Sequence, residues 1–186
     1  MSKYMILGGN GMLAYAIKTN PFFEDHISLD LPECDITDIK NIEKYVEKYR
    51  PECIINCAAY TDVAKAEIEL EKAMMVNAEA VKNIAQIAKK YSIRLVHYST
   101  DFVFKGDKDM VYTEEMIPNP VNNYGLSKLR GEEYIKDILP EALIIRISWL
   151  YGPNGKNFVS IISSLMKEKS QLNIVADQFK IGRAHV

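Results

Sequence analysis

The chain has 186 residues, of which 48% are hydrophobic and 26% charged, and its formal net charge at pH 7 is -2. A chain of this length can bury one core without disulfide or metal staples, and its size predicts one domain rather than two. The charge balance gives no sign of the basic face that nucleic acids or anionic membranes attract, so we expect neither as a partner.

Short apolar runs alternate with longer amphipathic segments along most of the chain. We expect strands at residues 4–7, 26–29, 53–59, 94–99, 142–148 and 172–175. We expect helices at residues 12–20, 39–50, 64–90 in two parts, 124–137 and 158–169. Strands separated by helices predict right-handed crossovers and a parallel sheet. The pattern therefore predicts an α/β fold, a Rossmann-like doubly wound parallel sheet with helices on both faces.

The cysteines and the N-terminus bear on the compartment. The three cysteines, Cys34, Cys53 and Cys57, have no zinc-type spacing, and a strand would put Cys53 and Cys57 on one face. Buried reduced thiols are favoured there over a redox pair. The first ten residues, MSKYMILGGN, contain too short an apolar run for a signal peptide. We therefore expect a cytoplasmic protein.

A glycine-rich turn joins the first expected strand to the first expected helix. The sequence MILGGNGMLA places Gly8, Gly11 and Ala14 there. Such a turn lets a pyrophosphate approach the backbone, and the N-terminus of the following helix favours the anion. Asp30 ends the second strand, where an acid can bind the adenosine ribose. Because it would repel a 2′-phosphate, Asp30 mildly favours NAD(H) over NADP(H).

Two further segments fit the same cofactor without proving it. Asp35 can contact the adenine or cap the N-terminus of the next helix, and the two roles are not exclusive. The small residues of NCAAYTDV, residues 56–63, follow the third strand. They leave room for a ligand at the carboxyl edge of the sheet, or allow close packing between strand and helix.

The fourth strand and the next helix carry groups suited to carbonyl reduction. The strand ends in YSTD, residues 98–101, and Tyr124 and Lys128 lie one helical turn apart. Tyr124 would protonate a carbonyl oxygen as a hydride arrives from a nicotinamide. The charge of Lys128 would lower the tyrosine pKa, ordinarily near 10, and its amine would bind the nicotinamide ribose. Thr100 would hydrogen-bond the substrate oxygen and stabilise its developing charge.

In combination these motifs resemble the extended short-chain dehydrogenase/reductase family. Within it, HYSTDFVFKG, PNPVNNYGLSKLRGEE, IIRISWLYG and KNF are similar to the dTDP-4-dehydrorhamnose reductases, from about Tyr4 to Phe179. The resemblance implies reduction of the 4-keto group of dTDP-4-dehydro-L-rhamnose to dTDP-L-rhamnose by NADH or NADPH. It implies a dTDP-sugar substrate and a nucleotide-binding Rossmann-like domain over residues 1–180. The oligomeric state stays open, with a homodimer as one possibility.

The resemblance also implies site residues. The catalytic trio falls on Thr100, Tyr124 and Lys128. Substrate contacts fall on Thr100, Asp101 and Trp149, although Trp149 could instead be a core aromatic residue. The cofactor positions are Gly8, Asn10, Gly11, Met12, Leu13, Asp30, Asp35, Ile36, Ala59, Tyr60, Thr61, Tyr98, Tyr124 and Lys128.

Some acids and one loop lie outside these assignments. We interpret the acids Glu114, Glu115, Glu132 and Glu133 as a solvated loop and helix face, so no metal site is predicted. Residues 105–123 lack periodicity and predict a functional or mobile loop that leads to Tyr124.

The end of the chain departs from the family. Relatives continue after Asp177 and Gln178 with a glycine and a further substrate-binding region, whereas this chain continues with FK and then IGRAHV. Residues 181–186 resemble the translation of a common sequencing adapter. We expect a non-native tail there, with a genuine short tail as the alternative, and a C-terminal substrate-binding region that is largely missing.

Two other functions remain open. A sugar-nucleotide dehydratase of this family would carry Thr-Asp-Glu at the strand end, but Phe102 follows Thr100 and Asp101 here. An epimerase would carry a serine-rich segment at that place. A non-catalytic dinucleotide-binding regulatory subunit, such as that of methionine adenosyltransferase, is the second alternative. The intact threonine, tyrosine and lysine set favours an enzyme.

Overall fold

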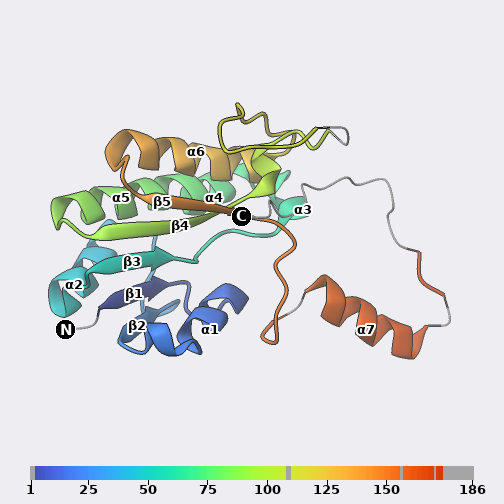
Figure 1. Ribbon diagram of the computed structural model, residues 1–186, viewed down its shortest axis with the longest axis horizontal. Coiled ribbons are helices and arrows are strands. Elements are labelled where there is room, and N and C mark those ends of the chain that lie inside the picture. Colours follow the sequence, from blue (N-terminus) through green and yellow to red (C-terminus); the bar gives the residue numbers. More distant parts are fainter. Residues whose placement is uncertain (1–2, 108–109, 156, 170, 174–186) are drawn as a thin grey trace.

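The centre of the molecule is a parallel sheet of five strands in the order β2-β1-β3-β4-β5 (Figure 1). The computed structural model describes residues 3–107, 110–155, 157–169 and 171–173. The strands are β1 (Tyr4–Leu7), β2 (His26–Leu29), β3 (Cys53–Asn56), β4 (Arg94–Thr100) and β5 (Leu143–Ile147). From β1 the chain adds β2 on one side and then β3, β4 and β5 on the other, as in doubly wound folds. The predicted fold class is confirmed.

Helices connect successive strands, and a last helix follows β5. The α-helices are α1 (Met12–Lys18), α2 (Ile39–Tyr49), α3 (Val63–Ala66), α4 (Leu70–Met74), α5 (Ala80–Lys90), α6 (Asn123–Ile138) and α7 (Phe158–Glu168). The shorter elements are the 3-10 turns η1 (Pro21–Phe23) and η3 (Asp101–Val103) and the π-helical turn η2 (Met75–Glu79). The predicted helix over 64–90 is thus several elements, with a π-turn between α4 and α5.

The sheet buries both faces against helices, as predicted. On one face, Met5 and Leu7 of β1 join apolar side chains of α2, α5 and α6 in the larger core. On the other face, Tyr4 and Ile6 pack against Ala14 and Ile17 of α1. The near-continuous apolar runs of β1 and β3 follow from this arrangement, because a strand covered on both faces has no solvent side.

The third strand is shorter than the prediction of 53–59, because it ends at Asn56. The side-chain oxygen of Asn56 accepts a hydrogen bond from the backbone N–H of Ala58 at 3.1 Å, which turns the chain away from the sheet. Of the predicted strand at 172–175, the described residues Leu172 and Asn173 are not in a strand, and the remainder lies outside the described residues. The tail at 181–186 also lies outside them and stays a prediction.

The three cysteines are free thiols. Cys34 and Cys53 are buried, whereas Cys57 is half-buried. Both Cys53 and Cys57 belong to the core on the α1 side of the sheet, as their spacing predicted. Burial raises the pKa of Cys34 to about 11 and that of Cys57 to about 12. The thiol form therefore prevails at neutral pH, which agrees with a structural role.

The predicted loop before Tyr124 is anchored at several points. The hydroxyl of Tyr112 accepts hydrogen bonds from the backbone N–H groups of Gly106 and Asp107, at 2.9 and 2.8 Å. The backbone N–H of Asn119 donates to the carbonyl oxygen of Val103 at 2.9 Å. These contacts fold the loop back on its own start and lead the chain into α6, which begins at Asn123.

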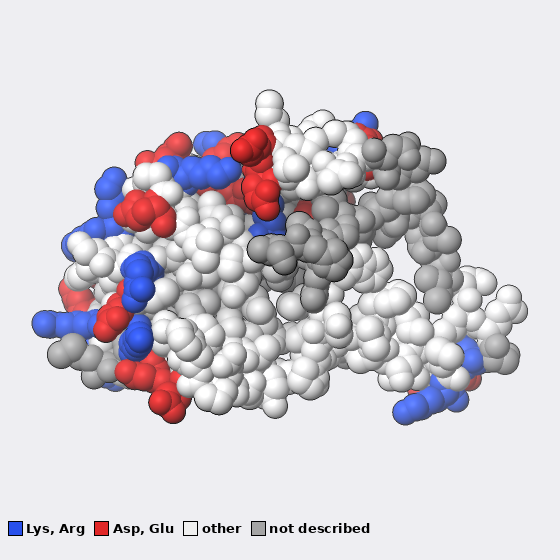
Figure 2. All heavy atoms as spheres, viewed as in Figure 1, with Lys and Arg blue, Asp and Glu red and all other residues white. Residues whose placement is uncertain are grey.

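Helix α7 stands apart from the other helices, at the right of Figure 1. None of its described residues is buried, and Val159 and Met166 are 58% and 68% exposed. On the face shown in Figure 2, charges of both signs are intermingled and lie mostly away from the centre of the view. In the described part of the chain, no helix combines the length and apolar character needed to cross a bilayer.

Candidate active site

A cleft of about 690 Å³ opens at the carboxyl ends of the strands. Its walls come from the loop between β1 and α1, the segments after β2, β3 and β5, the end of β4 and the start of α6. The predicted site residues that line it are Gly8, Asn10, Gly11, Met12, Leu13, Asp30, Asp35, Ile36, Ala59, Thr61, Tyr98, Thr100, Asp101, Tyr124, Lys128 and Trp149. Segments far apart in sequence therefore meet where open α/β sheets bind their ligands.

The glycine loop is held in place by neighbours from three elements. Gly8 has a φ of +75°, and a Cβ there would lie 2.6 Å from the Cα and N of Ala58. A carboxylate oxygen of Asp30 accepts from the backbone N–H of Asn10 at 2.7 Å. The Nζ of Lys18 donates to the carbonyl oxygen of Gly9, also at 2.7 Å. The sequence did not point to Lys18, because its role depends on the fold of the loop.

Replacement of Gly8 by alanine is expected to destabilise the protein by at least about 1–3 kcal/mol, because the left-handed conformation is costly for a side chain. Backbone atoms of Ala58 also occupy the space that the new methyl group needs. Thermal unfolding would show a lower Tm. Gly152→Ala is the matched control, since its Cβ would make only ordinary contacts with Met12. Equal Tm values for the two variants would contradict this account.

The two predicted acids occupy different positions along the cleft. Asp30 also accepts a hydrogen bond from the backbone N–H of Leu31 at 2.7 Å, so its carboxylate bridges the two loops. Asp35 accepts from the backbone N–H and the hydroxyl of Thr37, at 2.8 and 2.7 Å. The alternative role of Asp35 as a helix cap is wrong, because the cap of α2 is Asp38, which accepts from the N–H of Lys40.

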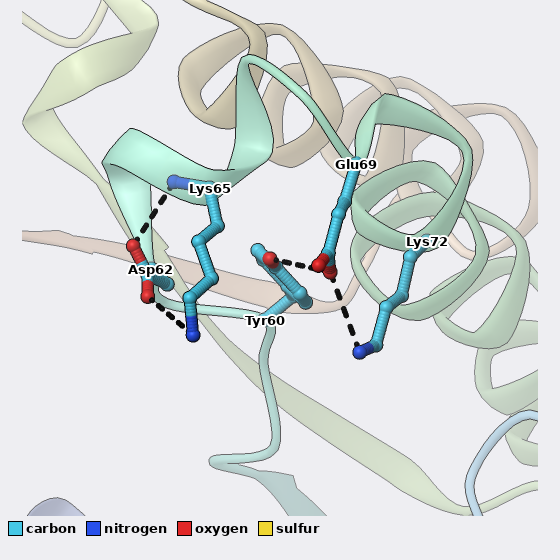
Figure 3. Close-up of polar contacts among 5 residues, drawn as sticks. All are labelled: Tyr60, Asp62, Lys65, Glu69 and Lys72. Atoms are coloured by element: carbon cyan, nitrogen blue, oxygen red, sulfur yellow. Dashed lines mark hydrogen bonds and ion pairs between the residues drawn. The ribbon is translucent and has the colours of Figure 1, made fainter.

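Tyr60 is the predicted site residue that does not line the cleft. Its hydroxyl donates to Glu69 at 3.0 Å, and Glu69 also pairs with Lys72 at 3.4 Å (Figure 3). Nearby, Asp62 caps α3 by accepting from the backbone N–H of Lys65. The Tyr60 side chain thus joins the surface of α4, and its assignment to the cofactor stays a prediction without support from the cleft.

Tyr124 stands at the first turn of α6, beside the end of β4. The side chain of Asn122 caps this helix by accepting from the N–H of Gly125 at 2.7 Å. A Cβ at Gly125 would collide with the carbonyl oxygen of Phe102, so the glycine lets the helix approach the segment after β4. Tyr124 therefore lines the cleft together with Thr100, and burial raises the Tyr124 pKa above its usual value.

Lys128 lies one turn beyond Tyr124 and also faces the cleft. It is only 2% exposed, and its Nζ donates to the carbonyl oxygen of Tyr98 at 2.7 Å. Burial lowers the Lys128 pKa to about 8. The expected lowering of the Tyr124 pKa is not found in this structure, because burial is the main influence on this phenol and raises its pKa.

Asp101 and Trp149 form the side of the cleft nearest β5. Asp101 accepts hydrogen bonds from the hydroxyls of Thr100 and Ser148, at 3.2 and 2.8 Å. Trp149 is 51% exposed and meets the ring of Phe158 edge to face at 5.3 Å. The alternative that Trp149 is a core aromatic residue is therefore wrong, whereas its assignment to the substrate stays a prediction.

Buried side chains that the sequence did not single out support the site. Asn77, in the π-turn, is fully buried and holds the backbone N–H and carbonyl oxygen of Tyr60 at 2.9 and 3.0 Å. It also donates to the hydroxyl of Ser127, which in turn donates to the carbonyl oxygen of Tyr124. The only sequence signal was an asparagine inside an apolar helical stripe. The π-turn aims this amide inward, a common use of such turns near functional sites.

The interpretation of Glu132 as part of a solvated helix face is wrong. Glu132 is 0% exposed and accepts from Nε and an NH2 group of Arg146 at 3.0 and 2.6 Å. The partner lies on β5, so the helix sequence alone could not show the pairing. Glu133 pairs with Arg130 at the surface instead. Within the described ranges, no three histidine, cysteine or acidic side chains are placed to hold a metal ion.

Comparison with known proteins identifies the family. A family model described as the RmlD substrate binding domain matches residues 2–182. A dTDP-4-dehydrorhamnose reductase of Aggregatibacter actinomycetemcomitans is 37% identical over 182 residues, 96% of this chain and 62% of its own length. A dTDP-4-keto-6-deoxy-D-glucose reductase of Streptomyces niveus is 34% identical over 95% of this chain and 62% of its own length.

A solved structure shows the same likeness. The dTDP-4-dehydrorhamnose reductase of Bacillus anthracis, in complex with NADP, superposes with a TM-score of 0.89 at 40% identity. The match covers 96% of this chain and 65% of that protein. The chain thus spans less than two thirds of the length of these relatives. Together with the cleft and its residues, these matches show that the chain belongs to the dTDP-4-dehydrorhamnose reductase (RmlD) family.

Proposed function

We propose that the whole protein reduces the 4-keto group of dTDP-4-dehydro-L-rhamnose, giving dTDP-L-rhamnose, with NADH or NADPH as the reductant. The observation that carries the proposal is the meeting of Thr100, Tyr124 and Lys128 in the cleft that also contains the glycine loop. The named relatives, two of which are dTDP-4-dehydrorhamnose reductases, support the choice of substrate.

The cleft residues fit a nicotinamide dinucleotide. The positive φ of Gly8 and its close approach to Ala58 shape a turn without side chains before α1, where a pyrophosphate can reach backbone N–H groups. Asp30, whose carboxylate accepts from the backbone N–H of Asn10 in that turn, would bind the adenosine ribose. When bound, the cofactor supplies the hydride. Lys128, which also lines the cleft, would bind the nicotinamide ribose.

The protein itself would supply the proton that the ketone oxygen receives during the reduction. The side chains of Tyr124 and Thr100 both line the cleft, so a substrate carbonyl bound there would meet both hydroxyls. Its oxygen would receive its proton from Tyr124 and a stabilising hydrogen bond from Thr100. In the structure the single proton of the Thr100 hydroxyl is donated to Asp101, which also accepts from Ser148, so Thr100 would turn this proton to the ketone oxygen when the substrate binds. Trp149, on the same side, would contact the sugar.

Asp30 should influence the choice between the two cofactors. Its carboxylate would repel a 2′-phosphate, so Asp30→Asn is expected to raise the affinity for NADPH relative to NADH by roughly tenfold. Fluorescence titration with each nucleotide measures the ratio. Asp25→Asn, at the opposite edge of the sheet, is the control and should leave the ratio unchanged. A ratio unaffected by Asp30→Asn would remove this residue from the ribose site.

The proposal is tested by cofactor oxidation with a version of this protein as long as its relatives. Addition of dTDP-4-dehydro-L-rhamnose should start oxidation of NADH or NADPH, followed by absorbance. If the cofactor binds but is not oxidised by this or a related keto sugar, the reductase proposal fails and the regulatory alternative is favoured. Formation of a dehydrated or epimerised sugar instead would favour the other enzymes of the fold.

A second substrate has support of its own. The Streptomyces niveus relative is named a dTDP-4-keto-6-deoxy-D-glucose reductase, at an identity close to that of the Aggregatibacter protein. Both ketones place a carbonyl at C4 of a dTDP-linked sugar, so the same proton donor could serve either. Parallel assays with the two substrates decide between them, because the true substrate should show the higher kcat/KM.

A further inference from the structure

A line of buried polar side chains runs from β3 through β4 to α6, below the cleft. His97 is 0% exposed, Asn56 1% and Lys128 2%. Nδ1 of His97 lies 3.0 Å from Nδ2 of Asn56, and Nε2 of His97 lies 3.2 Å from Nζ of Lys128. His97 has no part in the proposed chemistry described so far. Buried polar atoms need partners, so the role of each atom in this line can be worked out.

One backbone group fixes the direction of every hydrogen bond. The N–H of Ala58 can only donate, and it meets Oδ1 of Asn56 at 3.1 Å. The other amide atom of Asn56, which faces His97, is therefore the NH2 group, and this group can only donate. Nδ1 of His97 must accept, and a neutral ring then carries its proton on Nε2. This N–H points at Nζ of Lys128.

The charge of Lys128 matters at this contact. A lysine ammonium has three N–H donors and no acceptor, so it would oppose the Nε2–H group of His97. A neutral amine has a lone pair that can accept that hydrogen bond while one of its own N–H groups donates to the carbonyl oxygen of Tyr98, at 2.7 Å. The geometry around His97 therefore favours the neutral amine.

We propose that His97 is a positioning residue of the candidate site, which donates from Nε2 to Lys128, orients its amine toward the cleft and disfavours its charged form. The inference rests on the proposed function only in that Lys128 is taken to act in the cofactor cleft. Asn56 has a part in the same device, because it keeps the ring proton on Nε2.

The other groups around Lys128 either favour its charged form, against the effect of His97, or are uncharged. Glu132, one turn along α6, favours the charged form, although its carboxylate is already bound by Arg146 of β5. Cys57, after β3, is a neutral thiol because burial raises its pKa to about 12. Burial holds the pKa of His97 well below its usual range, so the ring stays neutral. Because the pKa of Lys128 is about 8, a small effect of His97 changes the charged fraction of this lysine near neutral pH.

The test is a titration of Lys128 in the 186-residue chain, followed by NMR of lysines labelled with 13C at Cε. Lys128→Met identifies the signal. In His97→Phe an aromatic ring remains but the N–H is lost, so the midpoint of the Lys128 titration should rise by about one pH unit, a tenfold change in protonation. His26→Phe, which changes a histidine of β2 outside the cleft, should leave the midpoint unchanged.

The direction of the change decides the proposal. If Nε2 of His97 instead accepts from a lysine ammonium, its loss would lower the midpoint; a lower or unchanged midpoint overturns the proposal. Should His97→Phe fail to fold, 15N NMR of the unaltered protein distinguishes protonated from unprotonated ring nitrogens. The proton must be on Nε2, and a proton on Nδ1 overturns the proposal. Neither readout needs turnover, so failure of the proposed reductase activity would be seen separately.

Discussion

In a version as long as its relatives, Tyr124→Phe is expected to lower kcat by about 10²–10⁴-fold while cofactor binding is retained. The phenol lines the cleft beside Thr100, and phenylalanine keeps the ring without the proton. The ring contact with Phe102, at 5.7 Å, would remain and should preserve the start of α6. Steady-state kinetics with the keto sugar and nucleotide titration measure the two properties.

The same helix offers a matched control for this variant. Tyr134 donates its hydroxyl to Glu79 at 2.8 Å and is not part of the cleft lining. Tyr134→Phe should therefore leave kcat nearly unchanged, because the lost hydroxyl lies outside the cleft, and its effect on stability should stay within about 0.5 kcal/mol. Full turnover by Tyr124→Phe would remove Tyr124 as the proton donor, whatever the fate of the other assignments.

The largest effect on stability is expected from Arg146→Met, which leaves Glu132 as a buried carboxylate without its main partner. Loss of one member of a buried ion pair costs about 3–5 kcal/mol, because the remaining charge is neither solvated nor paired. Lys136, whose Nζ lies 3.9 Å from Glu132, can offset only part of this cost. Chemical denaturation, read as the free energy of unfolding, measures the change.

Two further variants test the cause of that loss. Arg130→Met breaks an exposed ion pair with Glu133 on the same helix, and it should change the free energy of unfolding far less, because solvent screens such pairs. Replacing both Arg146 and Glu132 by methionine should recover most of the stability lost in Arg146→Met, since no unpaired charge remains buried. Equal losses in Arg146→Met and Arg130→Met would show that burial of Glu132 is not the cause.

Local pattern was enough to predict most of the architecture. The strands 4–7 and 26–29 were predicted to the residue, because short apolar runs between turn-forming residues specify buried parallel strands. The glycine turn was predictable because only a residue without a side chain suits the conformation of Gly8. The spacing of Tyr124 and Lys128 placed both on one face of α6, and both line the cleft.

What the sequence could not show depends on contacts between distant residues. Lys128 meets His97 across 31 positions, and Asn56 meets His97 across 41. Helical periodicity predicted Glu132 as a surface residue, because the guanidinium that pairs with it lies on another element. The burial that lowers the pKa of Lys128 is also a property of the assembled sheet and helices, so this lowered pKa could not be predicted from spacing.

The most direct test of the cleft as a dinucleotide site is an NMR titration of the 186-residue chain with NADH and NADPH. Saturable binding of at least one nucleotide is expected, with the largest amide shifts at residues 8–13 and 98–101, two segments that contribute to the lining of the cleft. The second half of helix α7, which does not contribute to the cleft lining, provides an internal reference and should change little. No saturable binding, or shifts concentrated on α7 or α2 with residues 8–13 unchanged, would contradict the account.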